Sequence, residues 1–105
     1  MLAVSDIVTR LAEVKTKSAD ALRACEAEPD ASVVLVAVVR EFDSKASKAG
    51  QSADGDGSAR DAVIELEQAA DSAKAAAEAD PGLSAAAREV VLDAHLAICI
   101  LKTEV

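Results

Sequence analysis

Two turn sequences decide the fold of this chain: EAEPDAS at residues 26–32 and EADPGLS at residues 78–84. In each of them a proline follows an acidic residue, and proline disfavours helical geometry in the residue before it. A serine stands three residues after each proline, where its hydroxyl can cap the first turn of a new helix, and Asp30 is a second candidate for the cap in the first turn. Each turn therefore predicts the end of one helix and the start of the next.

On both sides of these turns, apolar and small residues recur at alternating spacings of three and four, as in a helix with one buried face. Four helices are expected, over about 5–28, 32–49, 59–79 and 84–105. The expected buried stripes are Val4, Ile7, Leu11, Val14, Ser18, Ala21 and Cys25; then Leu35, Val38, Phe42, Ala46 and Ala49; then Ala59, Val63, Leu66, Ala70, Ala73 and Ala77; and finally Ala87, Val91, Ala94, Ile98, Leu101 and Val105.

The run SVVLVAVV at residues 32–39 is the one segment with a second interpretation, because its β-branched composition also suits a buried strand. A lone strand has no partner elsewhere in the chain, and the apolar pattern continues at helical spacing as far as Ala49. We therefore interpret this segment as part of a helix.

The expected fold class is all-α: one domain over residues 1–105, forming a four-helix up-down bundle of two similar hairpins, 5–49 and 59–105. The linker at 50–58, GQSADGDGS, is rich in turn-forming residues. A shift of 52 residues aligns the hairpins with nine identities over 53 pairs, clustered at the turns. Both duplication of an ancestral hairpin and independent use of the same turn chemistry explain this internal repeat.

Composition and charge exclude several kinds of partner. The formal net charge of −8 repels phosphate backbones and anionic lipids, so we expect neither nucleic acid nor membrane binding. The longest apolar run, Val33–Val39, is far shorter than the roughly 20 residues of a membrane-spanning helix. With only two cysteines and no visible signal peptide, a cytoplasmic localisation is expected.

The second and fourth helices carry more apolar residues than one buried stripe requires, at 33–39 and 96–101. Either these helices are buried on several sides, or they present a contact face. We predict a non-enzymatic protein–protein interaction or oligomerisation module whose partner is a second copy, as in a homodimer, or another helical protein. The residues expected to form its interaction face are Val34, Val38, Phe42, Leu96 and Ile100.

A calcium loop is one alternative for the linker. Asp54, Asp56 and Ser58 fall at the first, third and fifth positions of an EF-hand loop, and Glu65 falls at the twelfth. Ala59 replaces the glycine of the sixth position, which permits the sharp turn of such loops. An ion-responsive Asp54–Glu65 segment therefore stands beside the simpler interpretation of a flexible linker.

His95 is the only histidine, and Cys99 follows it by one helical turn, a spacing that can supply two metal ligands but not a complete site. A single histidine in a four-helix bundle of this length also resembles histidine phosphotransfer domains, which implies a phosphoryl acceptor at His95. Those domains carry Lys and Gly soon after the histidine, whereas residues 96–99 here are apolar or Cys. A signalling module is thus the alternative function.

No other pattern indicates catalysis. The chain has no Ser-His-Asp or Cys-His arrangement that its spacing supports, and no glycine motif for phosphate. We therefore expect no enzymatic activity, no cofactor and no metal site.

Overall fold

The structure is a computed structural model that describes the backbone of residues 2–52 and 56–105, and the side chains of 2–51 and 59–105. Four helices account for nearly all of this backbone, and the described residues contain no strand. In chain order they are α1 (Val4–Glu26), α2 (Val33–Ser52), α3 (Asp56–Ala79) and α4 (Ala85–Glu104).

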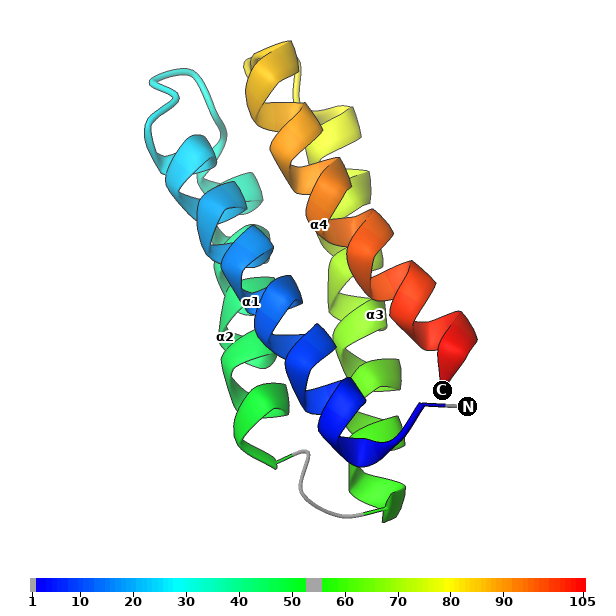
Figure 1. Cartoon of the computed structure of the whole chain (residues 1–105). Coiled ribbons are helices and arrows are strands. Elements are labelled where there is room, and N and C mark those ends of the chain that lie inside the picture. The colour runs from blue at the N-terminus through cyan, green and yellow to red at the C-terminus, as the bar shows by residue number, and fades with distance from the viewer. Residues whose placement is uncertain (1, 53–55) are drawn as a thin grey trace.

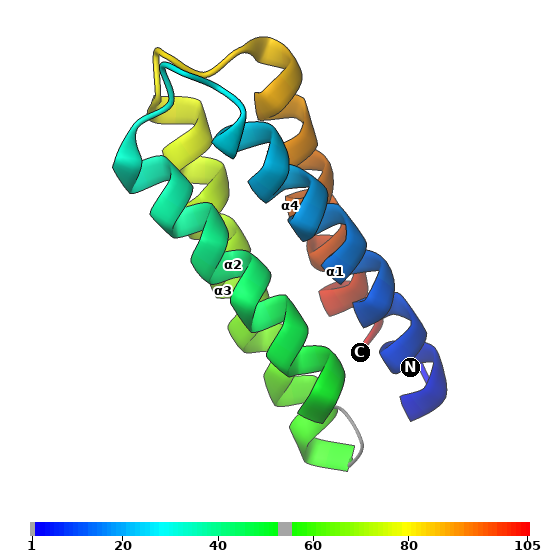
Figure 2. The same cartoon turned by 90° about the vertical axis from the view of Figure 1, so that its left-hand side faces the viewer.

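Consecutive helices run antiparallel, and α1 also packs against α4, so that the four helices surround one common core (Figures 1 and 2). The closely packed pairs are α1 with α2, α2 with α3, α3 with α4, and α4 with α1. It follows that α2 and α4 lie diagonally across the bundle. The predicted all-α, four-helix up-down bundle is confirmed.

The ends of the helices differ from the prediction where the two hairpins join. α2 continues through Gly50 to Ser52, and α3 begins at Asp56, so the predicted linker 50–58 is wrong at both ends. A glycine inside a helix costs about 0.5–1 kcal/mol relative to alanine. The buried Ala46 and Ala49 on the same helix offset this cost by packing in the core.

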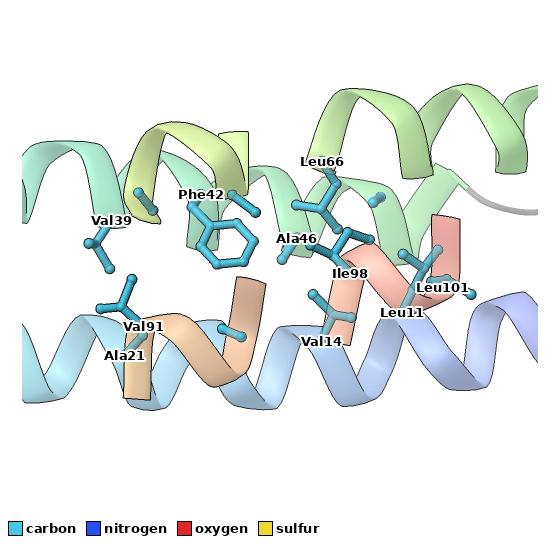
Figure 3. Close-up of a cluster of buried hydrophobic side chains, with 14 of the residues drawn as sticks. Leu11, Val14, Ala21, Val39, Phe42, Ala46, Leu66, Val91, Ile98 and Leu101 are labelled. Carbon is cyan, nitrogen blue, oxygen red and sulfur yellow. The ribbon is translucent and has the colours of Figure 1, made fainter. Parts of the chain in front are cut away.

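The core has the same register in both hairpins. Adding 52 to the number of each described core residue of α1 and α2 gives a buried residue of α3 or α4. At some of these pairs one hairpin has a large side chain where the other has a small one. Phe42 corresponds to Ala94, and Ala46 corresponds to Ile98. Figure 3 shows two levels of the core, one with Ala21, Val39 and Val91 and one with Val14, Ala46, Leu66 and Ile98.

One position of the predicted core stripe in α2 is wrong. Val39 is completely buried, whereas the predicted Val38 is only half-buried. The buried spacing in α2 is thus four, three, four and three, the same as in α4 from Ala87 to Leu101. The predicted stripes of α1 and α4 are correct except at the bundle end, where Val4 and Val105 are half-buried.

The two hairpin turns brace each other. Ser32 and Ser84 cap α2 and α4 as predicted, each hydroxyl accepting the backbone N–H three residues ahead, at 3.0 and 3.1 Å. The acidic residue before each proline then accepts the backbone N–H of the capping serine in the other turn. Asp80 accepts from Ser32 at 2.9 Å, and Glu28 accepts from Ser84 at 3.0 Å. This exchange joins the hairpins at one end of the bundle.

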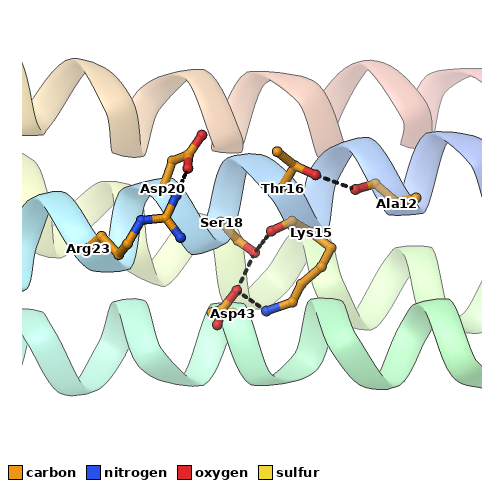
Figure 4. A network of polar contacts seen from close by, with 7 residues as sticks. All are labelled: Ala12, Lys15, Thr16, Ser18, Asp20, Arg23 and Asp43. Carbon is orange, nitrogen blue, oxygen red and sulfur yellow. Dashed lines mark hydrogen bonds and ion pairs between the residues drawn. The ribbon is translucent and has the colours of Figure 1, made fainter.

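A buried polar contact joins α1 to α2 (Figure 4). The Ser18 hydroxyl, completely buried, donates either to the Lys15 carbonyl at 3.0 Å or to the Asp43 carboxylate at 2.8 Å. The Lys15 ammonium bonds the same carboxylate oxygen at 2.7 Å. No buried side-chain nitrogen or oxygen lacks a partner among the described residues, so this polar group is tolerated in the core.

We expect the hydrogen bonds between the two turns to stabilise the fold in a pH-dependent way, because one of their acceptors is the Asp80 carboxylate. Hydrogen bonds from the backbone N–H of Ser32 and, secondly, of Gly82 hold the pKa of Asp80 below its usual value. A lowered pKa in the folded state stabilises the fold above the pKa of an unfolded Asp, about 3.9, and this contribution is lost as pH falls through the folded pKa. Asp80→Asn should therefore destabilise the protein at pH 7 and progressively less as the solution is acidified.

Urea titrations of the wild type and Asp80→Asn between pH 7 and pH 2 measure this difference. Asp30→Asn, which changes an exposed aspartate in the other turn, is the matched control. A difference between wild type and Asp80→Asn that stays constant with pH would contradict the prediction.

Candidate functional site

The N-terminal end of α2 exposes two adjacent large apolar residues. Val33 is 85% exposed and Val34 is 69% exposed, and the exposed Ala37 continues the surface one turn further along the helix. We call these three residues the α2 patch. Both valines lie just after the Ser32 cap, so the position of the turn directs them outward while Leu35 enters the core.

A second apolar surface lies on α4. Leu96 and Ile100 are 57% and 44% exposed, and their spacing of four puts them one above the other on the same face. We call this pair the α4 patch. The core positions of this helix, Ala94, Ile98 and Leu101, are already filled, so the bundle itself has no use for the α4 patch.

The predicted interaction face does not form one surface. Phe42 is completely buried, and it is therefore a core residue; its assignment to the face is corrected. Val38 is half-buried and lines an open groove between α2 and α3, together with residues such as Gln68 and Ala69. The remaining three, Val34, Leu96 and Ile100, are exposed, but they lie on helices that are diagonal in the bundle.

The other feature that combines several functional side chains lies between α3 and α4. His95 Nε2 is 2.7 Å from Asp71 Oδ1 and 3.4 Å from Cys99 Sγ. One oxygen, one nitrogen and one sulfur atom all lie within 4.8 Å of one another. The His95 side chain is mostly buried, whereas that of Asp71 is more than half exposed.

Charged groups continue this cluster towards the C-terminus. Glu67, nearly buried, accepts a hydrogen bond from the Lys102 ammonium at 2.6 Å. Hydrogen bonds with Glu67 and, secondly, with His95 lower the pKa of Asp71. Burial, followed by the negative charges of Asp71 and Glu67, raises the pKa of the Cys99 thiol.

These contacts do not have the geometry of a nucleophile activated by a base. In such a relay, the nucleophile and the carboxylate contact different nitrogens of the imidazole ring. Here Asp71 and Cys99 both lie closest to Nε2, and Cys99 is 3.8 Å from Nδ1. The raised pKa of Cys99 also disfavours the thiolate that catalysis needs.

The same contacts count against phosphotransfer. A phosphoryl group on Nε2 of His95 must displace the Asp71 carboxylate, and the two negative groups repel each other. The mostly buried ring is also unlike an acceptor that a second protein has to reach.

The predicted calcium ligands are placed only in part. Asp54 lies outside the described residues, as do the side chains of Asp56 and Ser58. α3 begins at Asp56, so positions three to twelve of the proposed loop are helical, unlike an EF-hand loop. The carboxylate of Glu65 bonds the Lys45 ammonium on α2 at 2.9 Å, and this ion pair lowers the pKa of Glu65. The predicted calcium loop is therefore wrong in its conformation.

Sequence reasoning missed Asp71 as a partner of His95. The signal was present in the turn, because counting equal distances from residues 81 and 82 places position 95 opposite position 68, within one helical turn of Asp71. Asp71 stands in a helix with many acidic residues, and nothing else in the sequence distinguishes it from them.

Comparison with known proteins yields no relatives: no family model, no curated protein and no solved structure matches this chain. Among the described helices, none is sufficiently long and apolar to cross a membrane.

Proposed function

We propose that this chain is a non-enzymatic protein–protein interaction module that associates with a second copy of itself through the α4 patch. The observation that carries the proposal is the exposure of Leu96 and Ile100 on a helix whose core positions are already filled. Exposed apolar residues that gather on one face are typical of a contact surface. The free thiols of Cys25 and Cys99 suit a reducing compartment such as the cytoplasm.

The size and charge of the chain limit the strength of this association. One helix face buries less than the roughly 1,200 Å² of a stable interface, so we expect a concentration-dependent dimer and not a permanent one. The net charge of −8 makes two copies repel each other. Added salt screens this repulsion, so self-association should become stronger as ionic strength rises.

Ile100→Glu should abolish the self-association, because it places a charge where two apolar ridges meet. The free energy of unfolding should change by only about 0.5 kcal/mol, since the residue is exposed and outside the core. Sedimentation equilibrium over a range of concentrations, at low and high salt, measures the molar mass. Circular dichroism verifies that the variant keeps its helices.

Val8→Glu is the matched control, because Val8 on α1 is an exposed large apolar residue outside both patches. It should leave the self-association unchanged. Val34→Glu distinguishes the two patches: a loss of dimer in this variant alone would assign the contact to α2. A wild-type chain that remains monomeric at every concentration and salt would overturn the proposed self-association.

A further inference from the structure

Three side chains between α3 and α4 point their donor atoms at one location. Asp71 comes from α3, whereas His95 and Cys99 come from α4 and are separated by one helical turn. The nitrogen His95 Nε2 lies 2.7 Å from the carboxylate oxygen of Asp71 and 3.4 Å from the sulfur of Cys99. Side chains on two different helices thus form one compact set of donors.

We infer that Asp71, His95 and Cys99 form a binding site for a divalent transition-metal cation with the ligand preference of Zn²⁺. Thiolate, imidazole and carboxylate are the three ligand types that zinc binds in proteins. Calcium and magnesium prefer oxygen ligands alone, so sulfur and nitrogen exclude them as the favoured ions. The site is independent of the α4 patch, because it concerns the contact between α3 and α4 within one chain.

Two of the three separations between donor atoms can be compared with those around a tetrahedral ion, and the third, from Asp71 to Cys99, is within 4.8 Å. Zinc–ligand bonds of 2.0–2.3 Å place neighbouring ligands roughly 3.3–3.6 Å apart. The separation of His95 and Cys99 already has this value, whereas that of Asp71 and His95 must open by about 0.7 Å. The Asp71 side chain, 57% exposed, is free on its solvent side to make this movement.

Binding exchanges protons for the metal. Without metal, the proton on His95 Nε2 occupies the short contact with Asp71. On binding, the neutral ring takes the tautomer with its proton on Nδ1, so that Nε2 donates its lone pair to the cation. The Cys99 thiol releases its proton to the solvent, because the thiolate is the ligand. Three protein ligands leave the fourth tetrahedral position to a water molecule.

The charges around the site favour a cation. Asp71 supplies a carboxylate to the site, and the acidic side chain of Glu67 lies beside it, bonded to the Lys102 ammonium. The same carboxylates that raise the pKa of the Cys99 thiol attract a divalent ion. A bound cation therefore removes the repulsion that disfavours the thiolate.

A titration of the reduced protein with Co²⁺ tests the site directly. One equivalent should produce the visible bands of tetrahedral cobalt, together with a near-ultraviolet charge-transfer band that requires a thiolate ligand. Cys99→Ser should lose the charge-transfer band. His95→Gln and Asp71→Asn should each raise the Kd for cobalt by more than about tenfold, since even second-shell changes cost this much.

Two controls separate the site from unspecific binding. Cys25→Ala removes the other thiol, which lies in the core, and should leave the cobalt spectrum unchanged. Asp93→Asn removes an exposed carboxylate from α4 outside the donor set, and should leave the Kd unchanged. Free Zn²⁺ at one hundred times the wild-type Kd should raise the Tm of the wild type by about 10 °C, and that of Asp71→Asn by no more than about half as much.

Either of two results would overturn the inference. One is the absence of any saturable change in the cobalt spectrum up to millimolar metal. The other is a charge-transfer band that persists in Cys99→Ser and disappears in Cys25→Ala, which would place the bound metal elsewhere. Circular dichroism of each variant shows whether the fold is kept, so loss of binding can be told apart from loss of structure.

Discussion

Phe42→Ala is expected to lower the free energy of unfolding by about 3–5 kcal/mol, the usual loss when a buried aromatic ring is deleted. Phe42 is the only aromatic residue of the chain and is completely buried in the centre of the bundle (Figure 3). The register of the helices places the small residues Ser18, Ala70 and Ala94 at its level, and none of them can fill the space. Urea denaturation followed by circular dichroism measures the loss.

Two variants test whether the loss comes from the cavity. Phe42→Leu keeps most of the volume and should cost less than about 1.5 kcal/mol. Ala94→Phe overpacks the core by itself, but in the Phe42→Ala background it returns a ring from the equivalent position across the bundle. The double variant should therefore lose less stability than the sum of the two single variants.

The opposite outcome has a clear meaning. If Phe42→Ala keeps its free energy of unfolding and instead loses self-association, Phe42 belongs to an interaction face after all. The ring would then be exposed in solution, and not buried in the core of the bundle.

Gly82→Ala is expected to lower the free energy of unfolding by about 1–3 kcal/mol, as overpacking does elsewhere. A Cβ atom at this position lies 2.9 Å from the carbonyl carbon of Asp30, and closer still to its oxygen. Normal contacts between such atoms are about 3.5–4.0 Å. Because the obstacle is backbone, it cannot rotate away, and the two turns must separate. Chemical denaturation at pH 7 measures the loss.

Gly50→Ala is the matched control, because it makes the same chemical change at a position with nothing within 4 Å. Gly50 lies inside α2, where alanine favours the helix by about 0.5–1 kcal/mol, so this variant should be more stable than the wild type. Neither glycine has a positive φ angle, so the difference between the two variants reflects space and not backbone conformation. Equal effects of both substitutions would contradict the close approach of the turns.

The contact between the two hairpin turns also shows where the internal repeat must break. Asp30 and Gly82 are equivalent under the shift of 52 residues, and they are the two residues that meet. At such a meeting point one of the two equivalent positions has to lack a side chain. Duplication stays one of the two interpretations of the repeat, and the shared register of the two cores supports it.

Much of the fold could be predicted from the sequence, because helix periodicity and turn chemistry are local. Prolines and capping serines identified both hairpin turns, and the stripes of α1, α3 and α4 were predicted correctly over most of their length. The choice of Val38 instead of Val39 was wrong because a run of consecutive valines allows two phases. Aligning the repeat, in which Val39 matches the core residue Val91, was sufficient to decide between them.

The surfaces could be predicted only in part. An apolar excess on two helices was visible in the sequence, and Val34, Leu96 and Ile100 are indeed exposed. Two apolar faces can join only if their helices are neighbours. In this bundle α2 and α4 are diagonal, so their exposed faces are kept apart. The residues predicted on the two helices therefore lie on two separate surfaces of the bundle.

The sequence by itself determined the number of helices, the hairpin turns and most of the residues that face the core, because these follow from contacts within a few residues along the chain. Only the tertiary structure decided which side chains of different helices meet. It places Asp71 beside His95 and Gly82 against Asp30. It also lets Glu28 and Asp80 each accept a hydrogen bond from the opposite turn. Such contacts depend on the rotation and axial position of whole helices, which the packing of the complete core sets and no local pattern records.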